Sequence, residues 1–408
     1  MRRRAATVLG AVALGLAGVA FAWAGEFSQN FFAGLVRIWP WLPIVLTPAG
    51  FALVTWATRR FAPAASGSGI PQVMAAARQP QRAATGALVS LRSALVKVAG
   101  TLAMLMVGGS VGREGPTVQL SAAVGVAVHR WLRVPITAGV IIAGGAAGIA
   151  AAFNTPLAGV AFAIEELAAA FEQKVAVLVM AAVLIAGLVS LGVAGDYVYF
   201  GAMSQKLPLA SMLVGAPLAG LSGGVAGAAF ARTLIAFRAS AHPALAAARA
   251  RPIAFAAACG LMVALVGLAS RGLTWGTGYE TTRQLLQGTT VSWLFGPGKF
   301  LAALATALSG APGGIFAPSL SVGAGLGQLL GLVFPPQQSG ALVLLGMIGF
   351  FTGVVRAPLT AVIIVMEMTA DRTMILPLFA TALIADWTSA GLCRDKLYHA
   401  LSLGFADR

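Results

Sequence analysis

Three short segments rich in glycine and proline carry the residues best suited to chemistry. They occupy residues 66–71 (SGSGIP), 108–117 (GGSVGREGPT) and 310–319 (GAPGGIFAPS). Glycine permits a tightly turned backbone, and proline suits the first turn of a helix because its missing N–H needs no partner. Each segment therefore predicts a helix start whose free N–H groups and dipole bind an anion. We expect the three to meet around one anion site, the alternative being three ordinary helix kinks.

Two of these segments belong to a repeat with constant spacing. Pro116 and Pro318 are 202 residues apart, and so are Pro156 and Pro358 in a second pair of breaks. Paired broken helices in an apolar chain are the sequence pattern expected of a secondary transporter built from repeats. The spacing alone does not decide whether the repeats are parallel or inverted.

Four acidic residues lie close to these breaks. Glu114 stands beside an expected anion-binding helix start, where it would compete with the anion or carry a proton, unless it pairs with Arg113. Glu165 and Glu166 are adjacent, so they point about 100° apart around a helix. Glu367 follows Glu165 by 202 residues and has no second acid beside it. We therefore expect Glu165 to be structural and Glu166 to meet a water path.

Composition places the chain in a membrane. Of its 408 residues, 59% are hydrophobic and only 10% are charged, against about 25% charged residues in soluble domains. Apolar runs of about 20 residues recur, which is long enough to cross a hydrocarbon core of about 30 Å. We predict an all-α polytopic membrane protein with one transmembrane domain over residues 1–408. Repeat 1 would cover about 1–200 and repeat 2 about 207–408, joined near residues 196–209.

The distribution of charge excludes several classes of protein. The net charge is +15, but the Lys and Arg residues are scattered over short loops, which is typical of cytoplasmic loops and anionic lipid contact rather than of nucleic-acid binding. Cys259 and Cys393 are isolated, and no histidine motif accompanies them, so we expect neither a metal site nor a disulfide framework. Three arginines at residues 2–4 precede a long apolar run. We favour an uncleaved first helix over a signal peptide, whose apolar region typically has 7–15 residues.

Taken together, these motifs resemble the CLC family of chloride channels and chloride/proton antiporters. The resemblance spans about residues 30–402, and its most specific segments are residues 67–71 (GSGIP), 112–116 (GREGP) and 314–318 (GIFAP). It implies a CLC-type inverted repeat of tilted and broken helices, and a homodimer with one pore per subunit. The chain resembles bacterial members, without the cytoplasmic CBS domains.

The resemblance also implies an anion-binding set. Ser68 and Tyr398 would contact a central anion from opposite sides, and the backbone amides of Gly115, Ile315 and Phe316 would hold anions nearby. On chemistry alone, Ser68 would be a helix cap and Tyr398 an interfacial tyrosine that anchors a helix end. Serine rather than proline at position 68 resembles the chloride-preferring form of the family.

Two glutamates would move protons according to the same resemblance. Glu114 would be the external gate, which occupies an anion site when charged and leaves it when protonated. Glu166 would be the internal proton-transfer residue. The sequence departs from some bacterial relatives at Gln72 and Met74, where those relatives carry acids, which puts an ion pair near the gate in doubt.

Our leading hypothesis is therefore chloride/proton antiport in a bacterial inner membrane, with both termini in the cytoplasm. Its partners would be chloride, protons, membrane lipid and a second subunit, and no cofactor is expected. A passive chloride channel on the same scaffold stays open, because Glu166 favours coupling without deciding it. A membrane-embedded enzyme with Ser68 as nucleophile is a third alternative. It would need a base such as histidine, and no histidine is near the glycine-rich segments in the sequence.

Overall fold

The computed structural model describes residues 2–83, 86–167, 173–195, 198–203 and 206–405, and its regular structure is helical. Part of the expected join between the repeats, residues 196–197 and 204–205, lies outside the described residues. The helices of the first half are α1 (Arg2–Ile38), α2 (Pro43–Phe61), η1 (Pro63–Ala65), α3 (Ile70–Arg78), α4 (Pro80–Ala83), α5 (Leu91–Met106), α6 (Glu114–Trp131), α7 (Ala138–Phe153), α8 (Pro156–Phe162), the π-helix η2 (Ala163–Leu167) and α9 (Gln173–Ala194).

The second half continues the same helical architecture. Its helices are α10 (Leu209–Ala239), α11 (Pro243–Ala250), α12 (Pro252–Ala269), α13 (Tyr279–Leu286), α14 (Phe295–Leu308), α15 (Phe316–Gly331), η3 (Pro336–Gln338), α16 (Ser339–Val355), α17 (Pro358–Thr369), α18 (Ile375–Leu392) and α19 (Leu397–Leu403). Among the described residues, six helices are long and apolar enough to cross a membrane, and α7, α14 and α17 are apolar but shorter. The prediction of an all-α chain with many short or interrupted helices is therefore confirmed.

The spacing of 202 residues is repeated in the backbone itself. Helix α7 ends at Asn154 with φ 57°, and α16 ends at Arg356 with φ 61°, both in the left-handed conformation that terminates a helix. Two residues later, Pro156 begins α8 and Pro358 begins α17. The predicted paired breaks are thus sharp reversals in which one helix stops and another starts at once.

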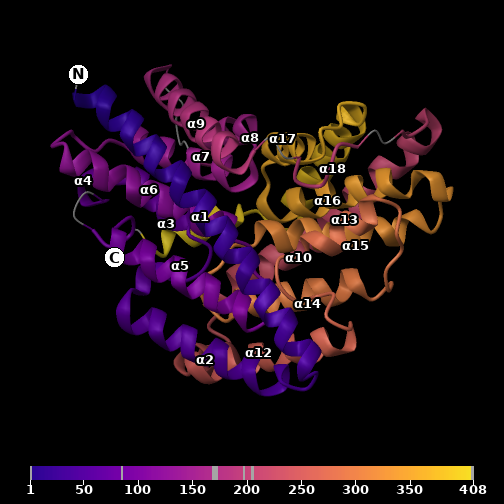
Figure 1. Ribbon diagram of the computed structural model, residues 1–408. Coiled ribbons are helices and arrows are strands. Elements are labelled where there is room, and N and C mark those ends of the chain that lie inside the picture. The colour runs from indigo at the N-terminus through magenta and orange to yellow at the C-terminus, as the bar shows by residue number, and fades with distance from the viewer. Residues whose placement is uncertain (1, 84–85, 168–172, 196–197, 204–205, 406–408) are drawn as a thin grey trace.

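The packing of helices is also repeated between the halves. Helix α1 packs on α6, α7 and α9, as α10 packs on α15, α16 and α18. The two halves meet where α2 lies against α12 and where α8 lies against α17 (Figure 1). Every break that could form a site therefore lies within a scaffold that both halves build.

Glycine allows the closest of these helix contacts. Gly223 and Gly227 on α10 face Gly349 and Gly353 on α16, and a Cβ at either position of α10 would overlap the opposing backbone. Close approach through small residues is the usual way to pack helices in a membrane, where lipid offers no hydrophobic driving force. Part of the glycine content therefore serves helix packing.

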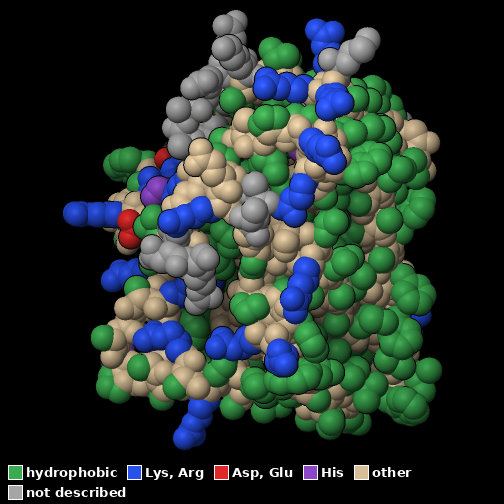
Figure 2. Space-filling view, turned by 90° about the vertical axis from the view of Figure 1, so that its left-hand side faces the viewer, with side chains coloured by type: hydrophobic (Ala, Val, Ile, Leu, Met, Phe, Trp, Pro, Cys, Tyr) green, Lys and Arg blue, Asp and Glu red, His purple; other side chains and the backbone are tan. Residues whose placement is uncertain are grey.

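The outer surface is apolar over large areas. Figure 2 shows one face on which hydrophobic side chains cover the right-hand part, while Lys and Arg gather along the centre and the left. Exposed large side chains include Trp131, Leu332 and Trp387, each about three-quarters accessible. Such a surface suits contact with lipid rather than with water.

Two of the acids cap helices of the opposite half. Glu165, on η2, accepts hydrogen bonds from the amides of Leu359 and Thr360 at 3.1 and 2.7 Å, and from the Thr360 hydroxyl at 2.7 Å. Glu367, on α17, accepts the corresponding amides of α8 at 3.1 and 2.7 Å. A carboxylate at a helix N-terminus satisfies free N–H groups and the dipole. The prediction that Glu165 is structural is confirmed.

We expect Glu165→Ala to lower the free energy of unfolding by about 1–2 kcal/mol, because α17 loses its cap. Thermal unfolding in detergent, followed by tryptophan fluorescence, measures the change. Glu280→Ala is the control, because Glu280 is exposed and, within the described part of the chain, accepts its side-chain hydrogen bond from Gln284 of its own helix. Equal melting temperatures for the two variants would contradict the capping role.

Candidate functional site

The three glycine-rich segments meet in the centre of the protein. Gly112 and Gly314 exchange backbone hydrogen bonds, with N···O distances of 2.8 and 2.7 Å. The amide of Gly313 donates to the carbonyl of Gly67 at 3.0 Å. Helices α3, α6 and α15 therefore begin at one place, as the sequence predicted.

The approach is so close that side chains would not fit. A Cβ at Gly115 would lie 2.5 Å from the Ser68 hydroxyl oxygen and 2.7 Å from the Ser68 carbonyl oxygen. Gly69 has φ 106°, which only glycine adopts readily. Glycine at these positions brings the Ser68 hydroxyl against the start of α6.

Two polar side chains fix the segment that carries Ser68. The ammonium of Lys97, on α5, is fully buried and donates to the carbonyls of Gly67 at 2.6 Å and Ser66 at 3.3 Å. The amide of Gln72 donates to the carbonyls of Ser66 at 2.6 Å and Ala64 at 3.0 Å. The side chain of Gln72 thus donates hydrogen bonds to backbone carbonyls here. An ionised carboxylate has no proton to donate and could not do so.

A cavity opens beside this meeting point, and we call it the Ser68 cavity. It is lined by Ser68, Gly314, Ile315, Tyr398 and Arg238 among others. The Ser68 and Tyr398 hydroxyls are both buried and lie close to each other, and neither oxygen makes a hydrogen bond of good geometry to a residue that the structure describes. Tyr398 is fully buried at the start of α19, so it is not the interfacial anchor that its chemistry alone suggested.

The chemistry of the Ser68 cavity suits an anion. Hydroxyl donors without partners lie beside the first turns of α6 and α15, where the N–H groups of a helix lack partners within it. Burying such donors is costly unless a ligand or water accepts from them. A dehydrated anion accepts from several donors at once and is favoured by the positive ends of helix dipoles.

Glu114 is fully buried at the start of α6. Its Oε1 accepts a hydrogen bond of 2.9 Å from the hydroxyl of Tyr279, while its Oε2 lies against Gly112, where a side chain would collide with it. The backbone amides of Glu114 itself and of Ala317 also lie close to the carboxylate, and its Oε2 has no side-chain hydrogen-bond partner among the described residues. One carboxylate oxygen is therefore held, and the other faces the meeting point of the glycine-rich segments.

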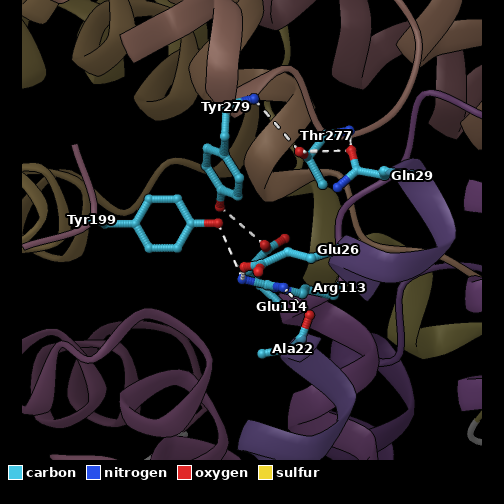
Figure 3. Close-up of polar contacts among 8 residues, drawn as sticks. All are labelled: Ala22, Glu26, Gln29, Arg113, Glu114, Tyr199, Thr277 and Tyr279. Carbon is cyan, nitrogen blue, oxygen red and sulfur yellow. Dashed lines mark hydrogen bonds and ion pairs between the residues drawn. The ribbon is translucent and has the colours of Figure 1, made fainter. Parts of the chain in front are cut away.

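Arg113 does not form its ion pair with Glu114, the structural alternative raised by the sequence. Its guanidinium pairs with Glu26 at 3.5 Å and donates to the Tyr199 hydroxyl at 3.1 Å and to the Ala22 carbonyl. Figure 3 shows these contacts beside the separate contact between Tyr279 and Glu114. The arginine therefore ties the start of α6 to helix α1 and leaves the carboxylate to Tyr279.

A second cavity lies on the other side of Glu114, and we call it the Tyr279 cavity. Its lining includes Tyr199, Tyr279, Arg37, Arg271 and Arg283, together with two acids, Glu26 and Glu280. The two cavities share no lining residue. Glu114 lies between residues that line one cavity and residues that line the other, so its side chain is placed to separate them.

Glu166 is also buried, on the π-helix η2. A π-helical turn is rare and often occurs at functional sites. The Oε2 of Glu166 makes no hydrogen bond to a described residue, in contrast to the capping carboxylate of Glu165 next to it. No hydrogen bond among the described residues joins Glu166 to Glu114.

Sequence reasoning missed a fourth glycine-rich segment. Residues 275–280 (WGTGYE) lead into α13 as residues 66–71 lead into α3, and Gly276 and Gly278 have positive φ as Gly67 and Gly69 do. The fully buried Lys299 donates to the carbonyls of this segment, as Lys97 does to its counterpart. The two lysines are 202 residues apart, whereas Gly276 follows Gly67 by 209 residues, so the constant spacing signals the lysines and not the turn itself.

Comparison with known proteins agrees with this architecture. The sequence model of the family described as voltage gated chloride channel matches residues 50–390. The H(+)/Cl(-) exchange transporter ClcA of Vibrio vulnificus (strain YJ016) is 34% identical over 379 residues, covering 87% of this chain and 78% of the relative. ClcA of Cronobacter sakazakii (strain ATCC BAA-894) is 31% identical over 431 residues, covering 96% and 87%.

Solved structures share the fold. A slow cyanobacterial Cl-/H+ antiporter superposes with a TM-score of 0.84 at 25% identity, covering 100% of this chain and 99% of that one. A CLC-type fluoride/proton antiporter gives 0.78 at 22% identity, covering 95% and 96%. The chain therefore belongs to the CLC family of voltage gated chloride channels and has its all-α fold, an inverted repeat of tilted and broken helices.

Proposed function

We propose that this protein exchanges chloride for protons across a bacterial inner membrane. One observation carries the proposal: a buried carboxylate, Glu114, lies between two cavities, and one of these presents hydroxyl donors without partners. The names of the curated relatives, H(+)/Cl(-) exchange transporters, support the same reading. Members of this family are transporters rather than enzymes, which rules against a membrane-embedded enzyme with Ser68 as nucleophile.

In this proposal, chloride binds in the Ser68 cavity. The hydroxyls of Ser68 and Tyr398 donate to it, together with backbone amides of Gly115, Ile315 and Phe316. The guanidinium of Arg238, which lies 5.7 Å above the Phe405 ring at the same cavity, attracts anions to the entrance. The donors are held by the scaffold, so little ordering is needed when chloride arrives.

Glu114 links chloride to the proton. The charged carboxylate occupies the path between the cavities and competes with chloride. Protonation removes the charge, so the side chain leaves and chloride takes its place. Glu166 supplies or accepts the proton on the side of the Ser68 cavity, where a buried acid without a capping role is placed to do so.

We place the Ser68 cavity on the cytoplasmic side. Both chain ends lie on the left of Figure 1, and Figure 2 looks onto that side, where Lys and Arg gather. Loops rich in Lys and Arg stay in the cytoplasm. This orientation puts both termini inside the cell, and the apolar flanks then contact lipid and a second subunit.

The central prediction is uphill proton movement. In proteoliposomes with high external chloride, and with valinomycin and potassium carrying the compensating charge, chloride entry should acidify the medium against a proton gradient. Glu114→Gln should abolish proton movement and leave chloride flux, because a neutral amide cannot carry the proton. A pH electrode and a chloride electrode measure the two fluxes. Chloride flux in the wild type without any proton movement would establish the passive channel instead.

The role of Glu166 has its own test. Glu166→Gln should lower the ratio of proton to chloride flux by roughly 10-fold or more, the scale of a lost proton-transfer group. The adjacent Glu165→Gln is the matched control, because Glu165 caps α17. The Glu165→Gln protein that folds should keep the wild-type ratio of proton to chloride flux. An unchanged ratio in Glu166→Gln would remove Glu166 from the proton path.

The chloride site predicts a loss of affinity on removal of single hydroxyls. Ser68→Ala and Tyr398→Phe should each weaken chloride binding about 10-fold, the scale of one hydrogen bond to a charged group, measured by titration calorimetry. Ser402→Ala is the control, because its buried hydroxyl donates to the His399 carbonyl on the same helix as Tyr398. Anomalous scattering from bromide should peak between Ser68 and Tyr398; a peak elsewhere would move the site.

A further inference from the structure

The hydroxyl of Tyr279 is the side-chain partner of the buried Glu114 carboxylate. It donates to Oε1 at 2.9 Å, and no other side chain among the described residues hydrogen-bonds to this carboxylate. The contact joins residues from opposite halves of the chain, 165 positions apart. At the Tyr279 cavity, the group that hydrogen-bonds to Glu114 is therefore the Tyr279 hydroxyl, which comes from the second half of the chain.

The backbone that presents Tyr279 is rigidly held. Lys299 donates to the carbonyls of Thr274 at 3.0 Å and Gly276 at 2.7 Å. Gln29 of α1 accepts from the Thr277 amide at 2.8 Å and from its hydroxyl at 3.1 Å. Tyr279 follows as the first residue of α13. Groups on such a fixed backbone act as pre-set donors rather than as mobile contacts.

The ring of Tyr279 is packed independently of its hydroxyl. Its centroid lies 4.4 Å from that of Tyr199 and 5.6 Å from that of Phe200, and its side chain is almost fully buried. Removing the hydroxyl alone leaves this packing unchanged. The Tyr279→Phe protein should therefore fold as the wild type does.

Several other charged or titratable groups surround Glu114. They are Arg113 at the start of α6, Glu26 on α1, Tyr199 in residues 198–201 and Tyr398 on α19. Arg113 is committed to Glu26, Tyr199 and α1. The other donors to the carboxylate are backbone amides, those of Glu114 itself and of Ala317, so Tyr279 supplies the side-chain hydrogen bond to its seated position.

Building on the proposed chloride/proton exchange, we propose that Tyr279 is a positioning residue that holds the charged Glu114 in the anion path and thereby sets the pH at which chloride passes. A donor to a carboxylate stabilises its charged, seated form. Without that donor, protons and chloride displace the side chain more easily. Chloride flux then continues at a higher pH than in the wild type.

The test measures chloride efflux from proteoliposomes between pH 5 and pH 9. Tyr279→Phe should carry roughly 10-fold more chloride than the wild type at the alkaline end, the scale of one hydrogen bond to a charged group. The fall in flux should move by about one pH unit to higher pH. A purely structural role would change the amplitude of the curve and leave its midpoint in place.

Two further variants identify the route of the effect. Tyr199→Phe is the matched control, because it removes a hydroxyl in the same aromatic cluster that accepts a hydrogen bond from Arg113, and its midpoint should equal that of the wild type. In a Glu114→Gln background, adding Tyr279→Phe should change nothing, because the carboxylate is gone.

Each contrary outcome has one meaning. A Tyr279→Phe midpoint equal to that of the wild type would overturn the inference while leaving chloride transport intact. An equal shift in Tyr199→Phe, or a shift that persists beside Glu114→Gln, would also overturn it, because the effect would not pass through the phenol and the carboxylate. A wild type that carries no chloride would instead refute the proposed function, and the inference with it.

Discussion

The site depends on hydrogen bonds between backbone groups of the two halves. At membrane depth, backbone that is not helical must find partners within the protein, because lipid offers none. Gly112 and Gly314 satisfy each other, and Gly313 satisfies the carbonyl of Gly67. These bonds use the groups that would otherwise be orphaned, at the place where Gly313, Gly314 and Ile315 line the Ser68 cavity. The meeting point of the glycine-rich segments can therefore form only when both halves have folded against each other.

Buried lysines complete this arrangement in an unusual way. Lys97 and Lys299 are fully buried, yet each meets carbonyl oxygens of a glycine-rich turn rather than an acid. A buried ammonium is tolerated only when it is hydrogen-bonded. The same device is used twice, at equivalent places of the repeat. One turn presents Ser68 to the first cavity, and the other presents Tyr279 to the second. The repeated scaffold thus supports two chemically different cavities near Glu114, the Ser68 cavity and the Tyr279 cavity.

The four buried or capping acids fall into two classes, those that the repeat duplicates and those that it does not. Glu165 and Glu367 are related by the repeat, and each caps a helix of the other half. Glu114 and Glu166 have no counterpart, because positions 316 and 368 hold phenylalanine and methionine. The duplicated acids stabilise the interface, where symmetry is useful. The unduplicated acids are buried, each with an oxygen that no described side chain hydrogen-bonds, and they break the symmetry of the repeat.

The sequence by itself determined the class of the protein, its repeat and the glycine–proline turns at which helices begin. Hydrophobic runs, the constant spacing and the glycine–proline breaks act through local backbone chemistry, so they can be read without the fold. Two features are visible in the sequence but were not predicted from it: the matching positions of Lys97 and Lys299, and the turn before Tyr279. The contact between Tyr279 and Glu114 belongs to the tertiary structure alone, as does the pairing of Arg113 with helix α1. Residues far apart in the chain become partners only through packing across the two halves, and no local pattern records the direction in which a buried side chain will point.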